Sequence, residues 1–409
     1  MKNLSFRQSS KMKIYATSQV ERLLAAYDKE ARNGKEMIAL NMGIPFYGML
    51  PEIKNNLKNS LADIKNDFYS PFPGKYELRT KLAEISSEKT GSLVTADEII
   101  ITAGASSGIF NILLAILNPN EEVIVPAPYF YTYRHQVELV GGQAREVYLT
   151  LDQNNHWEIP IETVKKTINS KTRAIIINSP NNPTGAIFSE KNLRELASLV
   201  EQKEIYIICD EVYDYLIYDN QSCFNLATIK ELKPYIFRCG SFSKIYGMTG
   251  WRVGYIQAAP ELITVLTGIN MDTVTCPPTI AQEAVIIGLT SKLDSLSEYI
   301  KQLIKNRKIL IENLDKMGDW FSYIPPQGAY YCWVKYNSEK LAKKTGINKW
   351  TSYDLAMQLT KEAQVGLFPG TCFGIGGEGY LRITFGGDSE KLIQGLDRIK
   401  NWFENKLTP

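Results

Sequence analysis

The chain has 409 residues, of which 44% are hydrophobic and 22% are charged, an ordinary globular composition that is long enough for two domains. Its 46 Lys and Arg balance 44 Asp and Glu, which argues against nucleic-acid binding driven by bulk charge. Six cysteines lie far apart without a C-x-x-C pair and the two histidines are isolated, so we predict neither disulfides nor a metal site.

The predicted elements alternate between helices and short apolar strands. A helical stretch over 18–31 comes first, in a terminus without an apolar segment of signal-peptide length, which predicts a cytoplasmic protein with no membrane partner. Runs rich in Ile and Val then recur at 98–102, 122–126, 173–179, 205–211 and 235–241. Unbroken runs of this length are typical of strands buried on both faces of a parallel sheet. Helix-like segments between them cover 107–117, 189–202 and 259–268.

The pattern changes beyond about residue 290. A long charged helix-like stretch covers 293–316, a strand-like segment covers 328–336, and an amphipathic helix closes the chain near 388–405. We therefore predict an α/β protein. Its large domain, 45–290, has a mostly parallel sheet sandwiched by helices, and its smaller α+β domain is formed by 1–44 and 291–409.

In a parallel sheet, ligands bind beyond the carboxyl ends of the strands, so the residues after each apolar run are the informative ones. The run at 98–102 is followed by small residues, 103–108, that open a helix and whose exposed amides suit a phosphate. The run at 173–179 is followed by a Pro- and Gly-containing loop that can aim the Asn182 amide inward. Each segment also fits a plain turn.

Two further runs end in, or are followed by, charged residues that can act in catalysis. Asp210 closes a buried strand, where a carboxylate is costly without a positive partner, although aspartate is also a common helix N-cap. Lys244 follows the run at 235–241, and a lysine whose pKa is lowered by burial becomes a nucleophile toward an aldehyde. Arg252, within a glycine-rich run, offers a planar fork for phosphate. Alone, such lysines and arginines are usually solvated charges. Their shared position indicates a pocket for an aromatic ring with a phosphate, a ring nitrogen and an aldehyde.

With these residues in place, the chain resembles the class I/II aminotransferases, the aspartate aminotransferase-like family of fold-type I pyridoxal-phosphate enzymes. The motifs are N-P-T-G at 182–185, D-E-V-Y at 210–213, S-F-S-K at 241–244 and G-W-R at 250–252, and the likeness covers about 38–385. The resemblance implies the fold-type I architecture and the cofactor pyridoxal 5'-phosphate. It also implies transfer of an amino group from an amino acid to a 2-oxo acid by a ping-pong mechanism.

The resemblance also implies roles for single residues around the cofactor. Lys244 would be the covalent anchor and proton shuttle, Asp210 would keep the ring nitrogen protonated, and Tyr213 and Asn182 would hydrogen-bond the ring hydroxylate. Phe130 would stack on the ring. The phosphate would be held by Ala105, Ser106, Ser241, Ser243 and Arg252.

Substrate and subunit contacts follow from the same comparison. Arg382 would grip the substrate α-carboxylate, with Gly43 and Asn182 beside it; without the resemblance, Arg382 is most simply an exposed charge on an edge strand. Tyr69 matches a tyrosine that reaches the phosphate of the neighbouring subunit, which implies a homodimer with shared active sites.

Two departures from the family pattern bear on specificity. Residues 270–272 read Asn-Met-Asp where aspartate-specific relatives carry a second arginine, which weakens the case for a dicarboxylate donor; Gln327 replaces a more usual glutamate. Tyrosines at 129, 131 and 133 fit an aromatic pocket or the packing of a helix or strand surface.

Other functions compete with transamination. The same scaffold supports β-elimination, cyclisation or oxidation of an amino acid, and it also occurs as a ligand-sensing domain without catalysis. A serine acyl-enzyme is a more distant alternative, because Ser241 to Lys244 is an S-x-x-K and 344–346 is a K-T-G.

Overall fold

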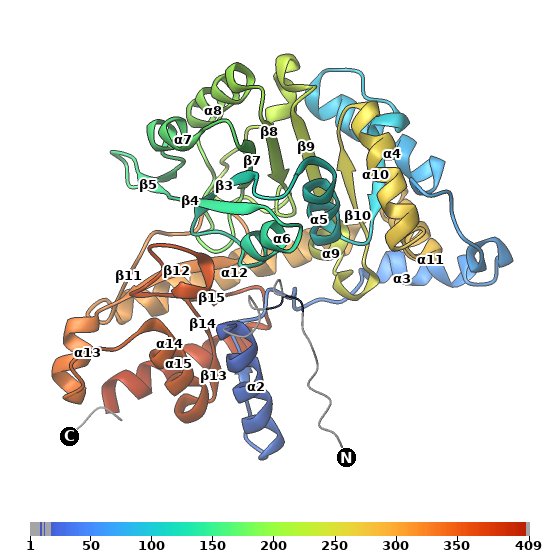
Figure 1. Cartoon of the computed structure of the whole chain (residues 1–409). Coiled ribbons are helices and arrows are strands. Elements are labelled where there is room, and N and C mark those ends of the chain that lie inside the picture. The colour runs from blue at the N-terminus through green and yellow to red at the C-terminus, as the bar shows by residue number, and fades with distance from the viewer. Residues whose placement is uncertain (1–8, 10–11, 13–17, 406–409) are drawn as a thin grey trace, which may run out of the picture.

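The large sheet forms the centre of the upper half of the molecule in Figure 1. This computed structural model describes residue 9, residue 12 and residues 18–405. The sheet has seven strands, in the order β2 (Ile99–Thr102), β10 (Gly254–Gln257), β9 (Ile236–Ser241), β8 (Tyr206–Asp210), β7 (Thr172–Asn178), β3 (Glu122–Ala127) and β4 (Gln143–Tyr148).

The sheet is mostly parallel, as predicted. Strands β4, β3, β7, β8 and β9 are parallel neighbours, whereas β10 runs antiparallel to both β9 and β2. The five apolar runs are therefore confirmed as strands, to within one or two residues. The sequence analysis did not predict β4 or β10, because neither has a long apolar run: β4 is QAREVY and β10 is GYIQ.

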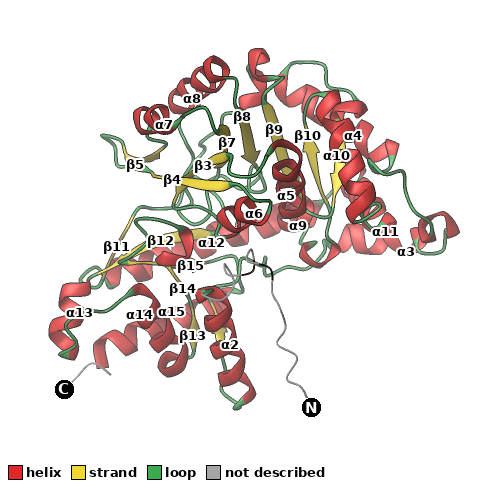
Figure 2. Ribbon diagram, in the orientation of Figure 1, coloured by secondary structure: helices red, strands yellow, loops and turns green. Residues whose placement is uncertain are grey.

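Helices cover both faces of this sheet (Figure 2). On one face, Ile175 and Ile177 of β7 pack in a core with α4 (Tyr76–Thr90), α8 (Glu190–Lys203) and α11 (Thr279–Thr290). On the other face, Ala174 and Ile176 pack with α5 (Ala105–Ile116), α6 (Thr132–Leu139) and α10 (Pro260–Thr273). Because successive strand residues point to opposite faces, an unbroken apolar run is needed to fill both cores.

A second, antiparallel sheet lies below the first in Figure 1. Its order is β11 (Phe321–Tyr323), β12 (Tyr331–Tyr336), β15 (Tyr380–Thr384) and β14 (Phe368–Pro369). Near it lie α2 (Gln19–Arg32), α13 (Ser338–Thr345), α14 (Ser352–Gln358) and α15 (Ser389–Asn405). A short parallel pair, β1 (Ile38–Ala39) with β13 (Val365–Gly366), joins the first segment of the chain to the last. The domain boundaries at 45 and 290 stay a prediction.

The remaining α-helices and a separate two-stranded sheet complete the fold. They are α3 (Pro51–Ser60), α7 (Ile161–Thr167), α9 (Phe242–Ile245), α12 (Asp294–Lys316) and the pair β5 (Thr150–Leu151) and β6 (Trp157–Glu158). Two of the predicted helices begin at serine N-caps, Ser18 and Ser189, whose hydroxyls accept backbone N–H bonds. Within the described part of the chain, no helix has both the length and the apolar character to cross a membrane.

Candidate active site

A cavity of about 290 Å³ lies where the parallel strands end. Asn178, Asp210 and Ser241, which line it, are the last residues of β7, β8 and β9. Residues of the second sheet close it from the other side, among them Tyr331, Phe368 and Arg382. All of the predicted site residues line this cavity except Tyr69: Gly43, Ala105, Ser106, Phe130, Asn182, Asp210, Tyr213, Ser241, Ser243, Lys244, Arg252 and Arg382.

Asp210 is a buried carboxylate held by hydrogen bonds. The Tyr133 hydroxyl donates to its Oδ2 (2.5 Å), and the Val212 N–H donates weakly to its Oδ1 (3.4 Å). Burial raises the pKa of Asp210 to about 6, against the lowering effect of the Tyr133 hydrogen bond. The alternative role as a helix N-cap is wrong, because no helix starts at residues 211–213. The carboxylate therefore fits a cationic ring nitrogen.

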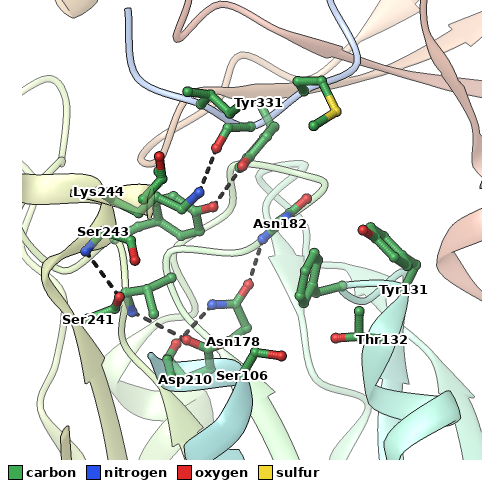
Figure 3. Close-up of a pocket in the computed structure, with 18 of the residues that line it drawn as sticks. Ser106, Tyr131, Thr132, Asn178, Asn182, Asp210, Ser241, Ser243, Lys244 and Tyr331 are labelled. Carbon is green, nitrogen blue, oxygen red and sulfur yellow. Dashed lines mark hydrogen bonds between the residues drawn. The ribbon is translucent and has the colours of Figure 1, made fainter. Parts of the chain in front are cut away.

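Lys244 lies in α9, directly after β9, and points into the cavity opposite Tyr131 and Thr132 (Figure 3). Its Nζ donates to the Gly43 carbonyl (2.5 Å). Burial, together with the nearby Arg382 and Arg252, lowers the pKa of Lys244 to about 8, against the raising effect of Asp210. The amine can thus be neutral near physiological pH, as a nucleophile toward an aldehyde requires.

The start of α5 and Arg252 form an anion site at one end of the cavity. Gly104 precedes α5 with φ of 86°, and a Cβ there would lie 2.4 Å from Nη2 of Arg252, so only glycine allows this approach. The Arg252 Nη2 donates to the Ala103 carbonyl (3.2 Å), which holds the guanidinium beside the helix N-terminus. Ser241 and Ser243 add hydroxyls to the lining. This donor set fits a phosphate.

Arg382 reaches the cavity from β15. It is buried, and its Nη1 donates to Asn182 Oδ1 (2.9 Å) while its Nη2 donates to the Asn41 carbonyl. Its Nε is buried and has no hydrogen-bond partner among the described residues, so the chain itself does not satisfy the whole guanidinium. The expectation of an exposed edge-strand charge is wrong, because β15 pairs with both β12 and β14.

Tyr331 is a site residue that the sequence analysis missed. Its hydroxyl hydrogen-bonds the Tyr213 hydroxyl (2.7 Å), and its ring lies 4.6 Å from the Arg382 guanidinium carbon. A Cβ on Gly43 would lie 2.0 Å from the Tyr331 hydroxyl, so Gly43 lets the chain pass this ring. The segment 328–336 shows only a strand pattern, which carries no signal for a cavity residue.

Asn178 is a second missed residue, and its amide links two strand ends. Its Nδ2 donates to the Asp210 carbonyl (2.8 Å) and its Oδ1 accepts the Asn182 N–H (2.7 Å), as Figure 3 shows. Its place near the end of the apolar run 173–179 was the available signal.

The three tyrosines near residue 130 divide between two roles. Tyr131 and Tyr133 line the cavity, whereas the Tyr129 hydroxyl donates to Glu146 (3.0 Å) and Tyr129 does not line it. Phe130 also lines the cavity. Tyr69 lies elsewhere, on the surface, with 82% of its area exposed.

Sequence comparison matches residues 35–399 to the family "Aminotransferase class I and II". The chain belongs to this family. It is 32% identical to aromatic-amino-acid aminotransferase 2 of Thermococcus litoralis, over 90% of this chain and 92% of that protein. It is 33% identical to an aspartate aminotransferase of Pyrococcus abyssi, over 91% and 94% of the two chains.

Solved aminotransferase structures share the fold of this aminotransferase. The aspartate aminotransferase of Thermotoga maritima superimposes with a TM-score of 0.86 at 29% identity, covering 97% of this chain and 99% of that one. The aromatic aminotransferase of Pyrococcus horikoshii OT3 gives a TM-score of 0.83 at 32% identity, covering 93% and 100%. The protein is a pyridoxal-phosphate-dependent aminotransferase of fold type I.

The K-T-G motif and the two departures from the family pattern lie outside the cavity lining. Lys344 of the K-T-G motif donates to the carbonyls of Phe403 and Glu404 at the end of α15. Asn270 is buried and donates to the Ile101 carbonyl (2.9 Å), which is a packing role. Gln327 accepts the Ile187 N–H (3.1 Å) and donates to Gln221 (3.1 Å), so it ties surface loops together.

The raised pKa of Asp210 predicts a pH-dependent cost in stability for the aminotransferase stripped of its cofactor. The folded pKa, about 6, exceeds the unfolded value, 3.8, so the folded protein binds this proton more tightly than the unfolded chain does. The stabilisation that comes from protonated Asp210 is therefore complete below pH 4 and is lost as the pH rises through 6. Two pKa units correspond to about 3 kcal/mol. We expect Asp210→Asn to raise the urea midpoint of the stripped protein at pH 8, and the gain to vanish near pH 4. A variant less stable than the original at pH 8 would contradict this.

Proposed function

We propose that the chain moves an amino group from an amino acid to a 2-oxo acid by a ping-pong mechanism, in which the first product leaves before the second substrate binds. One observation carries the proposal: Lys244, Asp210 and Arg382, which come from distant parts of the chain, line a single cavity. Bound pyridoxal phosphate supplies an aldehyde and an electron-withdrawing ring.

The residues at the ring end act on charge and protons. Lys244, whose amine is readily neutral, would anchor the aldehyde and could accept the proton from the substrate Cα. Asp210 would keep the ring nitrogen protonated, and Tyr213 and Asn182 would donate to the ring hydroxylate. Phe130 would stack on the ring. The hydrogen bond between the Tyr331 and Tyr213 hydroxyls would hold the Tyr213 hydroxyl in position toward the cofactor ring.

Two further groups bind the anionic ends of the ligands. The amides of Ala105 and Ser106, at the N-terminus of α5, would hold the phosphate together with Ser241, Ser243 and Arg252. Arg382 holds the substrate α-carboxylate, with Asn182 and Gly43 beside it. With its α-carboxylate on Arg382, the substrate would be held with its Cα toward Lys244, an orientation that proton transfer requires.

The cavity lining favours an amino donor with an uncharged, bulky side chain. The cations that line it, Lys244, Arg252 and Arg382, all have assigned partners, and the described residues add no fourth. Tyr131, Phe368 and Ile44 form an apolar wall instead. A dicarboxylate donor would find no cation for its second carboxylate among the described residues of its own chain, and an unpaired buried carboxylate is costly. The names of the relatives include both aromatic and aspartate aminotransferases, so the family alone does not decide this.

A panel of amino acids tests both the reaction and the donor class. Purified holoenzyme is mixed with each amino acid, and the change in the cofactor absorbance is followed, together with its reversal by a 2-oxo acid. We expect phenylalanine or leucine to react at least tenfold faster than aspartate. A preference for aspartate would contradict the donor class. Release of ammonia or peroxide without a reversible absorbance change would contradict transamination and favour elimination or oxidation.

We further propose a homodimer with shared active sites, in the cytoplasm. The exposed side chains from the end of α3 to the start of α4 support it: Leu61, Ile64, Phe68, Tyr69, Phe72 and Tyr76 are all more than 40% exposed. A surface rich in exposed apolar side chains is typical of a protein interface. Tyr69 lies in this surface and does not line the cavity of its own chain, as expected for a residue that serves the neighbouring subunit.

A further inference from the structure

Helix α6 contacts both ends of the cavity through two side chains, Tyr133 and Gln136. They are three residues apart and so lie on one face of the helix. The Tyr133 hydroxyl donates to Asp210 Oδ2 (2.5 Å), at the ring end. The Gln136 Nε2 donates to the carbonyl (2.9 Å) and the hydroxyl (3.0 Å) of Ser106, at the phosphate end.

The hydroxyl of Tyr133 is not needed for packing. The side chain is 1% exposed and its ring is held edge-on against Phe130, with centroids 5.8 Å apart. Phenylalanine would fill the same space, so what the hydroxyl adds at this position is the hydrogen bond to Asp210. Since burial raises the pKa of Tyr133 well above 10, the hydroxyl keeps its proton and remains a donor.

A glutamine side chain at the buried position 136 is also costly in free energy. It is 9% exposed, and its Oε1 has no hydrogen-bond partner among the described residues. An apolar side chain would avoid this unpaired oxygen. The two bonds from Nε2 to Ser106 are therefore the reason that the structure offers for a glutamine here.

We propose that α6 positions both ends of the cofactor site, with Tyr133 positioning Asp210 and Gln136 positioning Ser106. The inference rests on the proposed cofactor roles of Asp210 and Ser106. A hydrogen bond donated to the carboxylate stabilises its ionised form, which is the form that keeps a ring nitrogen protonated. The other ionisable groups around Asp210 are Glu211, Lys244, Tyr213, Cys209 and Cys239, and among the described residues none of these donates a hydrogen bond to its carboxylate.

Tyr133→Phe tests the ring end, because it keeps the ring and removes only the hydroxyl. The holoenzyme is reconstituted with ¹⁵N-labelled pyridoxal phosphate, and the ring-nitrogen NMR signal is followed against pH without substrate. We expect the ring nitrogen to lose its proton at a pH about one unit lower in the variant. The matched control is Tyr129→Phe, whose hydroxyl bonds Glu146 outside the cavity lining. An unchanged midpoint in Tyr133→Phe would overturn the role of Tyr133.

Gln136→Met tests the phosphate end with a side chain of similar length. We expect pyridoxal phosphate to dissociate about three- to tenfold faster. The affinity for pyridoxal, which lacks the phosphate, and the ring-nitrogen midpoint should stay the same. Equal weakening of both ligands, or loss of both readouts in both variants, would show a general packing role and overturn the proposal.

These measurements need no amino donor. Their outcome is therefore independent of the proposed transamination. A protein that eliminates or oxidises amino acids would still show the effect of Tyr133→Phe on the ring nitrogen and the effect of Gln136→Met on pyridoxal phosphate release.

Discussion

Lys244→Ala is expected to lower the rate of amino transfer by about 10⁴-fold, because one side chain serves as covalent anchor and as proton carrier. The variant should still bind pyridoxal phosphate through Arg252 and the start of α5. Its visible absorbance should match non-covalently bound cofactor, and borohydride should no longer fix the cofactor to the chain. Stopped-flow spectroscopy with a saturating amino donor measures the rate.

The matched control is Lys81→Ala, which removes an exposed lysine that pairs with Glu84 three residues away. Such a pair contributes at most about 1 kcal/mol, so rate and absorbance should not change. Borohydride fixation that persists in Lys244→Ala would show that another lysine is the anchor.

The same variant tests the shared active sites of the proposed dimer. Lys244→Ala and Tyr69→Ala chains are mixed under conditions that exchange subunits. If Tyr69 serves the neighbouring subunit, a mixed dimer has one site with both defects and one intact site, and activity should return. If Tyr69 acts within its own chain, every site keeps one defect and mixing restores nothing.

Arg382→Met is expected to lower kcat/KM by about 100-fold or more, mainly by raising KM. The cost of truncating one partner of a buried charge pair is about 2–5 kcal/mol. Arg382→Lys should recover little of the loss, because a lysine cannot hold Asn182 and a carboxylate with one planar fork. The direct measurement is the inhibition constant of a monocarboxylic acid that lacks the amino group, since binding of this acid involves no chemistry.

Arg398→Met is the control for this experiment, because Arg398 lies on α15 and pairs with Glu36 at the surface. The inhibition constant of the monocarboxylic acid should be the same for Arg398→Met as for the unchanged protein. An Arg382→Met variant that binds the acid normally but reacts slowly would place the carboxylate elsewhere.

The local sequence predicted the central sheet because its strands must fill a core on each face. The run RAIIIN could satisfy both cores in one register, and β7 follows it. Asp210 and Lys244 could be found in the same way, since a polar residue at the end of a buried parallel strand lies at the ligand-binding edge. The Tyr133 and Tyr331 hydroxyls had no such signal, because a tyrosine in a helix or strand pattern looks like packing.

The sequence by itself thus determined the α/β class, the strand ends that line the cavity and, through its motifs, the aminotransferase family. Only the tertiary structure decided what lies across from those strand ends. The Lys244 amine meets the Gly43 carbonyl 201 residues away, and Arg382 meets Asn182 across 200 residues. Local patterns encode strands and helices, whereas contacts over such separations depend on how the second sheet packs against the first. The side chains that close the cavity opposite the strand ends, among them Tyr331, Phe368 and Arg382, are placed by that packing.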